Sequence, residues 1–169
     1  MVWDHERDTE AFAERLARAL DALDRPGNAF IELRGNLGAG KTTFARHLLR
    51  ALGVAGRIKS PTYAVVETYE VARRTGPLNV AHFDFYRFND PDEWEEAGFR
   101  DLFAAPGLKL VEWAERAAGC LPPPDLLLDI RSQAAKDAQE AQESVDGPRE
   151  VKLLAPTPRG AGLAAALLA

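Results

Sequence analysis

The stretch GNLGAGKT, residues 35–42, matches the pattern G-x-x-x-x-G-K-[ST] of a phosphate-binding loop. Its glycines let the backbone curl until several N–H groups point at phosphate oxygens, and a following helix adds the positive end of its dipole. The apolar run 29–33 before it predicts a buried strand, and the apolar spacing after Lys41 predicts a helix. The context is therefore strand, phosphate loop and helix.

The loop residues that we expect to contact a nucleotide form one continuous segment, Asn36, Leu37, Gly38, Ala39, Gly40, Lys41, Thr42 and Thr43. Lys41 would reach the β- and γ-phosphates of ATP and is also a candidate catalytic residue, because it can offset negative charge there. The Thr42 hydroxyl would be a ligand of Mg²⁺. A plain glycine turn at the end of a strand is the alternative.

A magnesium site beside such a loop needs an acidic side chain at the end of a neighbouring strand. Asp84 is the leading candidate as metal ligand and catalytic residue, because it closes the apolar run 79–83. Without a phosphate loop, Asp84 would fit equally well as a turn or cap residue at a strand end.

Glu112 and Trp113 follow a second apolar run, 108–111. Glu112 could orient the attacking water as a catalytic residue, or it could hold magnesium or a magnesium-bound water. An ordinary surface carboxylate is the alternative. Trp113 could pack on the base or ribose of the nucleotide, and it could equally be rim or core packing.

Four further residues carry open interpretations. Ser60 and Thr62 of the segment Ser-Pro-Thr could sense the γ-phosphate as a switch, or form a plain turn before a strand. His82 lies inside an apolar run and is expected to be a hydrogen-bonded core histidine, with a role as a base as the alternative. Arg87 could pair with a phosphate or with a partner, or it could form a surface salt bridge.

The rest of the chain alternates strand-like and helix-like segments. Apolar spacing predicts a helix from Thr9, capped by Asp8 or Thr9 and ended by Pro26-Gly27. The remaining predicted elements are a hairpin of strands 65–71 and 78–85, short helices within 91–103 broken at Gly98, a closing strand pair 126–130 and 151–154, and a helix 163–168. The predicted fold class is α/β, a three-layer sandwich like that of P-loop NTPases, with a mixed, mainly parallel central sheet.

Size and charge limit the remaining possibilities. The 169 residues suit a single domain, 1–169, with 132–150 as a polar loop inside it. The net charge of −5 argues against direct binding of RNA or DNA, so any contact with tRNA should be indirect. We expect no membrane association, and an acidic N-terminus without a signal-like apolar stretch favours the cytoplasm. Cys120, the single cysteine, is expected to be structural.

Four motifs in this order, GNLGAGKTTF (35–44), KSPTY (59–63), HFDFYR (82–87) and VEWAER (111–116), resemble a small bacterial ATPase family. This is the TsaE/YjeE-like family of P-loop ATPases, required for biosynthesis of tRNA threonylcarbamoyladenosine. The resemblance covers residues 8–131. Two positions depart from the family pattern: Asn36 stands where an acidic residue is frequent, and Ala114 where proline is usual.

The resemblance implies an ATPase that supports threonylcarbamoyl transfer to adenosine beside the tRNA anticodon. Its partners would be the catalytic transferase subunit and that subunit's paralogous scaffold, and its activity alone would be weak. The family's phosphate-loop lysine and threonines would be Lys41, Thr42 and Thr43, and its magnesium aspartate Asp84. Glu112 and Trp113 would be its Glu-Trp pair, and residues 60–62 its switch.

Two other functions use the same loop. A small-molecule or nucleotide kinase would normally close an arginine-bearing lid over the phosphates, and the longest basic cluster here is Arg73-Arg74. A GTP-dependent switch protein would read its base with an Asn-Lys-x-Asp segment, which this sequence lacks.

Overall fold

The computed structural model describes residues 1–23, 27–74, 76–90, 92–132 and 147–168. Its elements in chain order are β1 (Val2–Trp3), α1 (Glu6–Asp21), β2 (Phe30–Arg34), α2 (Lys41–Ala51), β3 (Val66–Val71), β4 (Leu78–Asp84), α3 (Glu93–Glu96), α4 (Phe99–Ala104), β5 (Leu108–Glu112), the 3₁₀ helix η1 (Ala114–Ala117), β6 (Leu126–Ser132), β7 (Arg149–Leu154) and α5 (Pro158–Leu168).

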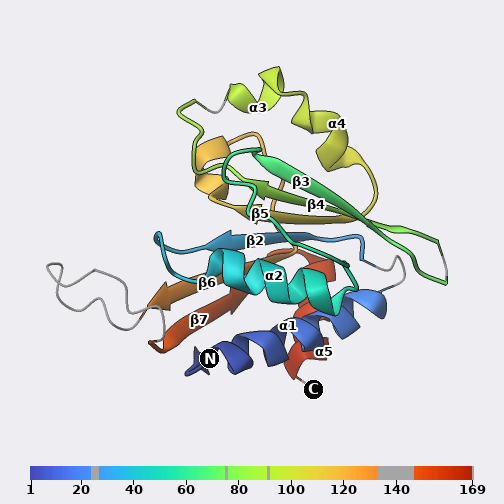
Figure 1. The fold of residues 1–169 in the computed structure, drawn as a ribbon, viewed down its shortest axis with the longest axis vertical. Coiled ribbons are helices and arrows are strands. Elements are labelled where there is room, and N and C mark those ends of the chain that lie inside the picture. Colours follow the sequence, from blue (N-terminus) through green and yellow to red (C-terminus); the bar gives the residue numbers. More distant parts are fainter. Residues whose placement is uncertain (24–26, 75, 91, 133–146, 169) are drawn as a thin grey trace, which may run out of the picture.

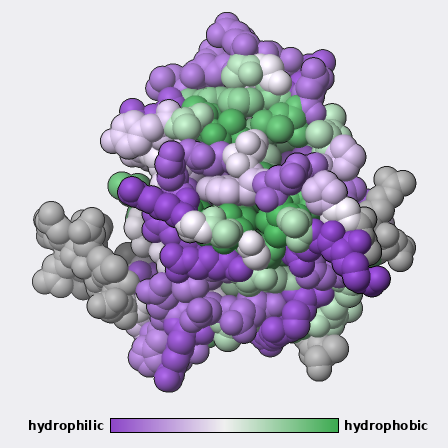
Figure 2. All heavy atoms as spheres, turned by 45° about the vertical axis from the view of Figure 1, so that its right-hand side comes forward, coloured by the Kyte–Doolittle hydropathy of each residue, from purple (hydrophilic) through white to green (hydrophobic). Residues whose placement is uncertain are grey.

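The strands form one mixed sheet in the order β1-β7-β6-β2-β5-β4-β3. The four central strands β6, β2, β5 and β4 run parallel, whereas β7, β1 and β3 join antiparallel at the edges. The carboxyl ends of β2, β4, β5 and β6 therefore lie together on one side of the sheet, at the left of Figure 1. Figure 2 turns the opposite side, where the amino ends of these strands lie, toward the reader. It shows apolar surface in the middle with hydrophilic surface around it.

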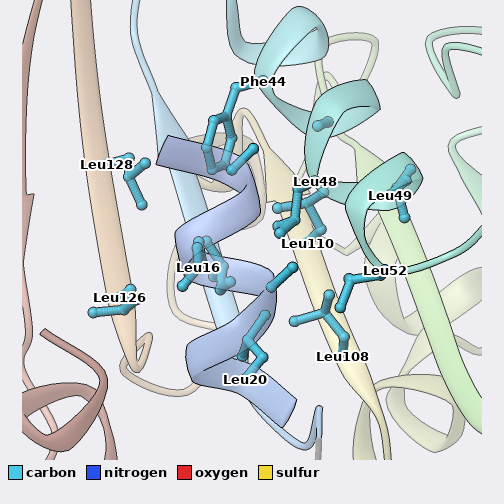
Figure 3. Packing of buried hydrophobic residues seen from close by; sticks show 14 of the residues in the cluster. Leu16, Leu20, Phe44, Leu48, Leu49, Leu52, Leu108, Leu110, Leu126 and Leu128 are labelled. Atoms are coloured by element: carbon cyan, nitrogen blue, oxygen red, sulfur yellow. The ribbon is translucent and has the colours of Figure 1, made fainter. Parts of the chain in front are cut away.

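Helices α1, α2 and α5 cover one face of the sheet (Figure 1). Helix α1 buries Phe12, Leu16 and Leu20, spaced four residues apart, because this spacing places them on one side of a helix. They pack with Phe44 and Leu48 of α2 in the larger core cluster. Figure 3 shows the leucines of α1 and α2 gathered in front of β5 and β6. This core fixes α2, and with it the loop that precedes α2, against the sheet.

Helices α3 and α4 cover the other face with an aromatic cluster (Figure 1). Phe83 of β4 lies at its centre, with ring centroids 6.1 Å from Trp94 and 5.5 Å from Phe99. Such tilted and edge-to-face pairs are the arrangements that aromatic rings prefer. With a helical layer on each face of a mixed, mainly parallel sheet, the predicted α/β sandwich is confirmed.

Some helices and strands begin or end at other residues than the sequence predicts. Helix α1 begins at Glu6 instead of Thr9, and the predicted cap at Asp8 or Thr9 is wrong: Asp8 lies in the first turn, where its carboxylate accepts the backbone N–H of His5. This is the reciprocal half of a capping box. Helix α5 begins at Pro158, five residues before the predicted start. The two-residue strand β1 was not predicted.

The polar loop predicted for 132–150 is shorter than expected, because Ser132, Arg149 and Glu150 belong to strands β6 and β7. Residues 133–146 of that loop, and Pro26 of the predicted helix stop, lie outside the described residues. None of the described helices combines the length and the apolar character that a membrane crossing needs.

Candidate nucleotide-binding site

The loop between β2 and α2 has the left-handed backbone that its glycines allow. Gly35 has φ +143° and Gly38 has φ +75°, values that residues with a side chain rarely adopt. A Cβ on Gly35 would lie 2.2 Å from the carbonyl oxygen of Ile130 on β6, whereas nothing lies within 4 Å of one on Gly38. Gly35 therefore lets the loop leave the sheet in close contact with the neighbouring strand.

Lys41, the first residue of α2, turns its side chain back into this loop. Its Nζ donates hydrogen bonds to the carbonyl oxygens of Gly35, at 2.6 Å, and Asn36, at 2.9 Å. The residue is only 5% exposed. Burial lowers the pKa of Lys41 from its ordinary value, while the carboxylates of Glu112, Glu115 and Asp84 act in the opposite direction. The fold thus holds a poorly solvated ammonium against two carbonyl oxygens of the loop.

Two carboxylates end the strands beside the loop. Asp84 and Glu112 are direct partners in the parallel pairing of β4 and β5, and Glu112 is paired on its other side with Leu33 of β2. Both are buried. The Thr42 hydroxyl donates to Oε2 of Glu112 at 2.8 Å, which joins the start of α2 to the end of β5. The structure thus excludes the alternative that Glu112 is a surface carboxylate.

The Ser-Pro-Thr segment reaches the same site. The Thr62 hydroxyl donates to Oδ2 of Asp84 at 2.7 Å, and the hydroxyls of Ser60 and Thr62 lie 2.8 Å apart. The other oxygen of Asp84 accepts the backbone N–H of Tyr86 at 2.9 Å. Val65, just beyond this segment, has φ +66°, which is unusual for a β-branched residue and indicates local strain.

His82 holds the remaining oxygen of Glu112. Its Nε2 donates to Oε1 of Glu112 at 2.9 Å, and the side chains of both residues are almost fully buried. As the sequence predicts, His82 is a hydrogen-bonded core histidine. Its partner could not be predicted, because it depends on the register of β4 against β5. Among the described residues, Nδ1 of His82 has no hydrogen-bond partner.

Trp113 lies at the lysine end of the loop. The Nζ of Lys41 is 4.1 Å from the centroid of its ring, a cation–π contact, and the ring of Tyr86 lies 5.0 Å away. The backbone of Trp113 is left-handed, with φ +59°. The guanidinium carbon of Arg87 is 4.3 Å from the ring centroid of Tyr63, a contact that none of the interpretations of Arg87 from the sequence included.

A cavity of about 260 Å³ opens on the other side of the loop. Its lining consists of residues from the chain start, the loop and the last two strands: Trp3, His5, Glu6, Thr9, Ala39, Gly40, Thr43, Ile130, Gly147 and Arg149. The Nε of Arg149 donates to the carbonyl oxygen of Ala39 at 3.1 Å. Sequence reasoning missed Trp3 and Arg149, because only the pairing of β1 with β7 brings them to the loop.

The oxygen donors at the site suit a hard cation. They are the Thr42 hydroxyl, the Glu112 carboxylate to which it donates, and the carboxylate of Asp84, which is the strand partner of Glu112. Within the described part of the chain, no three His, Cys, Asp or Glu side chains gather into a metal cluster. Mg²⁺ typically takes one or two carboxylates and completes its shell with water and phosphate, so this sparse donor set fits it.

Comparison with known proteins finds a family model and relatives that carry the same name. Residues 3–142 match the family model "Threonylcarbamoyl adenosine biosynthesis protein TsaE". The tRNA threonylcarbamoyladenosine biosynthesis protein TsaE of Haemophilus influenzae is 36% identical over 155 residues, which cover 92% of this chain and 88% of the relative. The protein of the same name from Aquifex aeolicus is 37% identical over 132 residues, covering 77% and 84%.

A solved structure agrees with these sequence matches. The crystal structure of Bacillus subtilis YdiB superposes with a TM-score of 0.69 at 28% identity, covering 99% of this chain and 93% of that one. The family model covers most of the chain, and the fold carries the motifs to one edge of the sheet. The chain therefore belongs to the TsaE family of threonylcarbamoyl adenosine biosynthesis proteins.

Proposed function

We propose that this chain binds ATP with Mg²⁺ and hydrolyses it as a cytoplasmic subunit that supports threonylcarbamoyl transfer to adenosine beside the tRNA anticodon. The main support is the convergence of Lys41, Thr42 and Glu112 at the start of α2, with Asp84 on the neighbouring strand. A lysine, a hydroxyl and strand-end carboxylates around a glycine loop are the parts that P-loop NTPases use for phosphoryl transfer.

The triphosphate would lie in the loop, against its N–H groups and the N-terminus of α2. Lys41 would exchange the carbonyl oxygens of Gly35 and Asn36 for phosphate oxygens. This exchange is favourable because the ammonium is poorly solvated where it lies. The ring of Trp113, whose centroid is 4.1 Å from the Lys41 ammonium, would then lie beside the same phosphates.

Thr42 and Asp84 would hold Mg²⁺, with Glu112 close enough to accept one of its waters. The bound ion would neutralise charge on the β- and γ-phosphate oxygens. Glu112 would orient the attacking water and accept its hydrogen bond, and His82 keeps that carboxylate from rotating. Thr62 would respond to the γ-phosphate through its hydrogen bond to Asp84, and Ser60 through its hydrogen bond to Thr62.

The nucleoside end would enter the cavity of about 260 Å³ beside Gly40 and Thr43. This volume lies just below the roughly 300–1,000 Å³ of typical ligand sites, which suits part of a nucleotide. An adenine base is favoured over guanine because the chain has no Asn-Lys-x-Asp segment.

The transferase catalytic subunit and its paralogous scaffold would bind around the loop. Leu37 and Tyr63 are 75% and 84% exposed there, and large exposed apolar side chains near a site are typical of protein contacts. With a net charge of −5 the chain would contact tRNA only through these partners. Partners that complete the charge arrangement would accelerate a slow intrinsic hydrolysis.

Hydrolysis assays test this proposal. Release of phosphate from ATP and GTP is measured for the chain alone, with the two transferase subunits, and with nucleotides or small alcohols as phosphate acceptors. We expect slow hydrolysis of ATP that the subunits increase. Rapid hydrolysis unchanged by the subunits would contradict the subunit role, and transfer to an acceptor would indicate a kinase.

Lys41→Ala tests the site itself. It should abolish hydrolysis while the chain stays folded, because Lys41 packs on the loop and contributes little to either core cluster. Lys152→Ala, on the exposed side of β7, is the matched control and should hydrolyse ATP normally. Normal hydrolysis by Lys41→Ala would refute the site assignment.

A further inference from the structure

A second, larger cavity lies at the opposite ends of the central strands from the phosphate loop. It has a volume of about 570 Å³, within the range of small-molecule sites, and opens at the amino ends of β2, β5 and β6. Apolar side chains form much of its wall, among them Phe30, Trp94 and Phe103. This is the face on which Figure 2 shows apolar surface.

Lys109 of β5 lines this cavity and is only 6% exposed. Its ammonium donates to the backbone carbonyl oxygens of Ala105 and Gly107. An ammonium has three donors, so one N–H has no acceptor among the described residues. A lysine near a surface normally keeps its head in water, and here burial lowers the pKa of Lys109 instead.

The acidic groups of the lining are already engaged. Glu95 pairs with Arg100. Asp125 accepts the backbone N–H of Phe30 at 2.9 Å and the Thr157 hydroxyl at 2.6 Å, and its carboxylate lies 3.5 Å from Arg159. Within the described residues no carboxylate forms an ion pair with Lys109, although a buried charge is normally paired.

We propose that this cavity binds a small organic acid, a carboxylate or phosphate monoester on a flat apolar body, with Lys109 as its counter-ion. The anion accepts the third N–H of Lys109, and the apolar body packs on Trp94 and Phe103. Arg100 and Arg159 offset the charges of Glu95 and Asp125 in the lining, so Lys109 leaves this lining with a net positive charge that attracts an anion. The site is separate from the phosphate loop and does not depend on the proposed ATPase activity.

Benzoate and phenyl phosphate are suitable probes, with uncharged benzamide as the matched control ligand. Each is titrated into the full chain and followed by the amide signals of Gly107 and Lys109 and the indole N–H signal of Trp94. The titrations are repeated with Lys41→Ala, so that binding of phenyl phosphate at the phosphate loop is separated from binding at this cavity.

We expect at least one of the two anions to shift these signals in saturable fashion, and benzamide to leave them unchanged. Lys109→Gln keeps donors for the two carbonyl oxygens but removes the charge, and should weaken binding about tenfold or more, as for loss of a charge-assisted hydrogen bond. Lys109→Met removes both the donors and the charge, and it should weaken binding to a similar extent. Lys152→Met removes a lysine outside the lining and should bind like the unaltered chain.

Three results would overturn the proposal. The first is no shift with either anion in the unaltered chain. The second is equal affinity for benzoate and benzamide. The third is unchanged affinity in Lys109→Gln, provided that this variant retains the far-ultraviolet circular dichroism and thermal transition of the parent. If Lys109→Met fails to fold, Lys109→Gln alone decides.

Discussion

The Lys41 ammonium has a lower pKa than an ordinary lysine because burial removes water from it. We expect affinity for ADP to fall with rising pH earlier than the ordinary value of 10.5 would suggest, since only the charged form attracts phosphate. Calorimetric titration between about pH 7 and 10 measures this. Lys41→Arg stays charged and should show little of this decline. A decline of equal size in both proteins would assign it to another group.

The effect of Lys41 on stability has the opposite sign. The folded chain loses this proton at lower pH than the unfolded chain, so between the two pKa values the unfolded chain binds more protons. The contribution of Lys41 to the free energy of unfolding therefore rises with pH in that window below 10.5.

His82 should affect turnover more than nucleotide affinity, because it hydrogen-bonds to Glu112 and does not line the cavity beside the loop. His82→Gln keeps an N–H donor for Glu112 and should retain most of kcat. His82→Phe leaves one carboxylate oxygen buried and unpaired, at a cost of about 1 to 3 kcal/mol. We expect a lower kcat at nearly constant KM in His82→Phe, measured by steady-state ATP hydrolysis. Equal loss in both variants would indicate a packing role only.

At the scale of elements, periodicity made most of the fold predictable from the sequence. Strands β2 and β5 are short apolar runs, and α1 and α2 repeat apolar residues at helical spacing. Strand β1 has only two residues and exists through its pairing with β7, so no local pattern marks it. The early start of α5 was missed because Pro158 and Gly160 are poor helix signals, although proline suits a first helical turn.

The candidate site, like the fold, could be predicted from the sequence only in part. The loop residues, Asp84 and Glu112 could be found because each follows an apolar run. The bonds that join them, Thr42 to Glu112 and Thr62 to Asp84, depend on strand order and register, which local sequence does not contain. The cavity beside the loop was unpredictable for a similar reason, because it is built from both ends of the chain.

Two glycines of the loop offer a test of its shape. Both Gly35→Ala and Gly38→Ala force a side chain into a left-handed backbone, at a cost of about 1 to 3 kcal/mol. Only Gly35→Ala also drives a Cβ against the Ile130 carbonyl oxygen. We expect Gly35→Ala to weaken ADP binding more than about tenfold, and Gly38→Ala to weaken it less. Calorimetry measures both, and the reverse order would contradict this account of the loop.

For the molecule as a whole, the chain start links the helical layer to the sheet. Trp3 is buried, with ring centroids 5.4 Å from Phe12 and 5.7 Å from Phe44, and it also lines the cavity beside the loop. Trp3→Ala should lower the free energy of unfolding by about 3 to 5 kcal/mol and weaken nucleotide binding as well. Urea unfolding and ADP titration measure the two effects.

Val2→Ala is the matched control for Trp3→Ala, because Val2 lies on the same strand but is exposed. It should change stability by less than about 0.5 kcal/mol. If Val2→Ala were as damaging as Trp3→Ala, backbone pairing of β1, and not the indole, would account for the effect.

The indole of Trp113 faces the Lys41 ammonium, whereas Trp3 and Trp94 are buried in the two cores. A charge 4.1 Å from an indole alters the energy of its excited state, so moving that charge toward a phosphate would change the colour and yield of the light it emits. If the loop binds a nucleotide as proposed, Trp113 would therefore give an intrinsic optical signal of loop occupancy that needs no attached dye. Trp113→Phe should remove this part of the emission change and leave the part that comes from Trp3 in the neighbouring cavity.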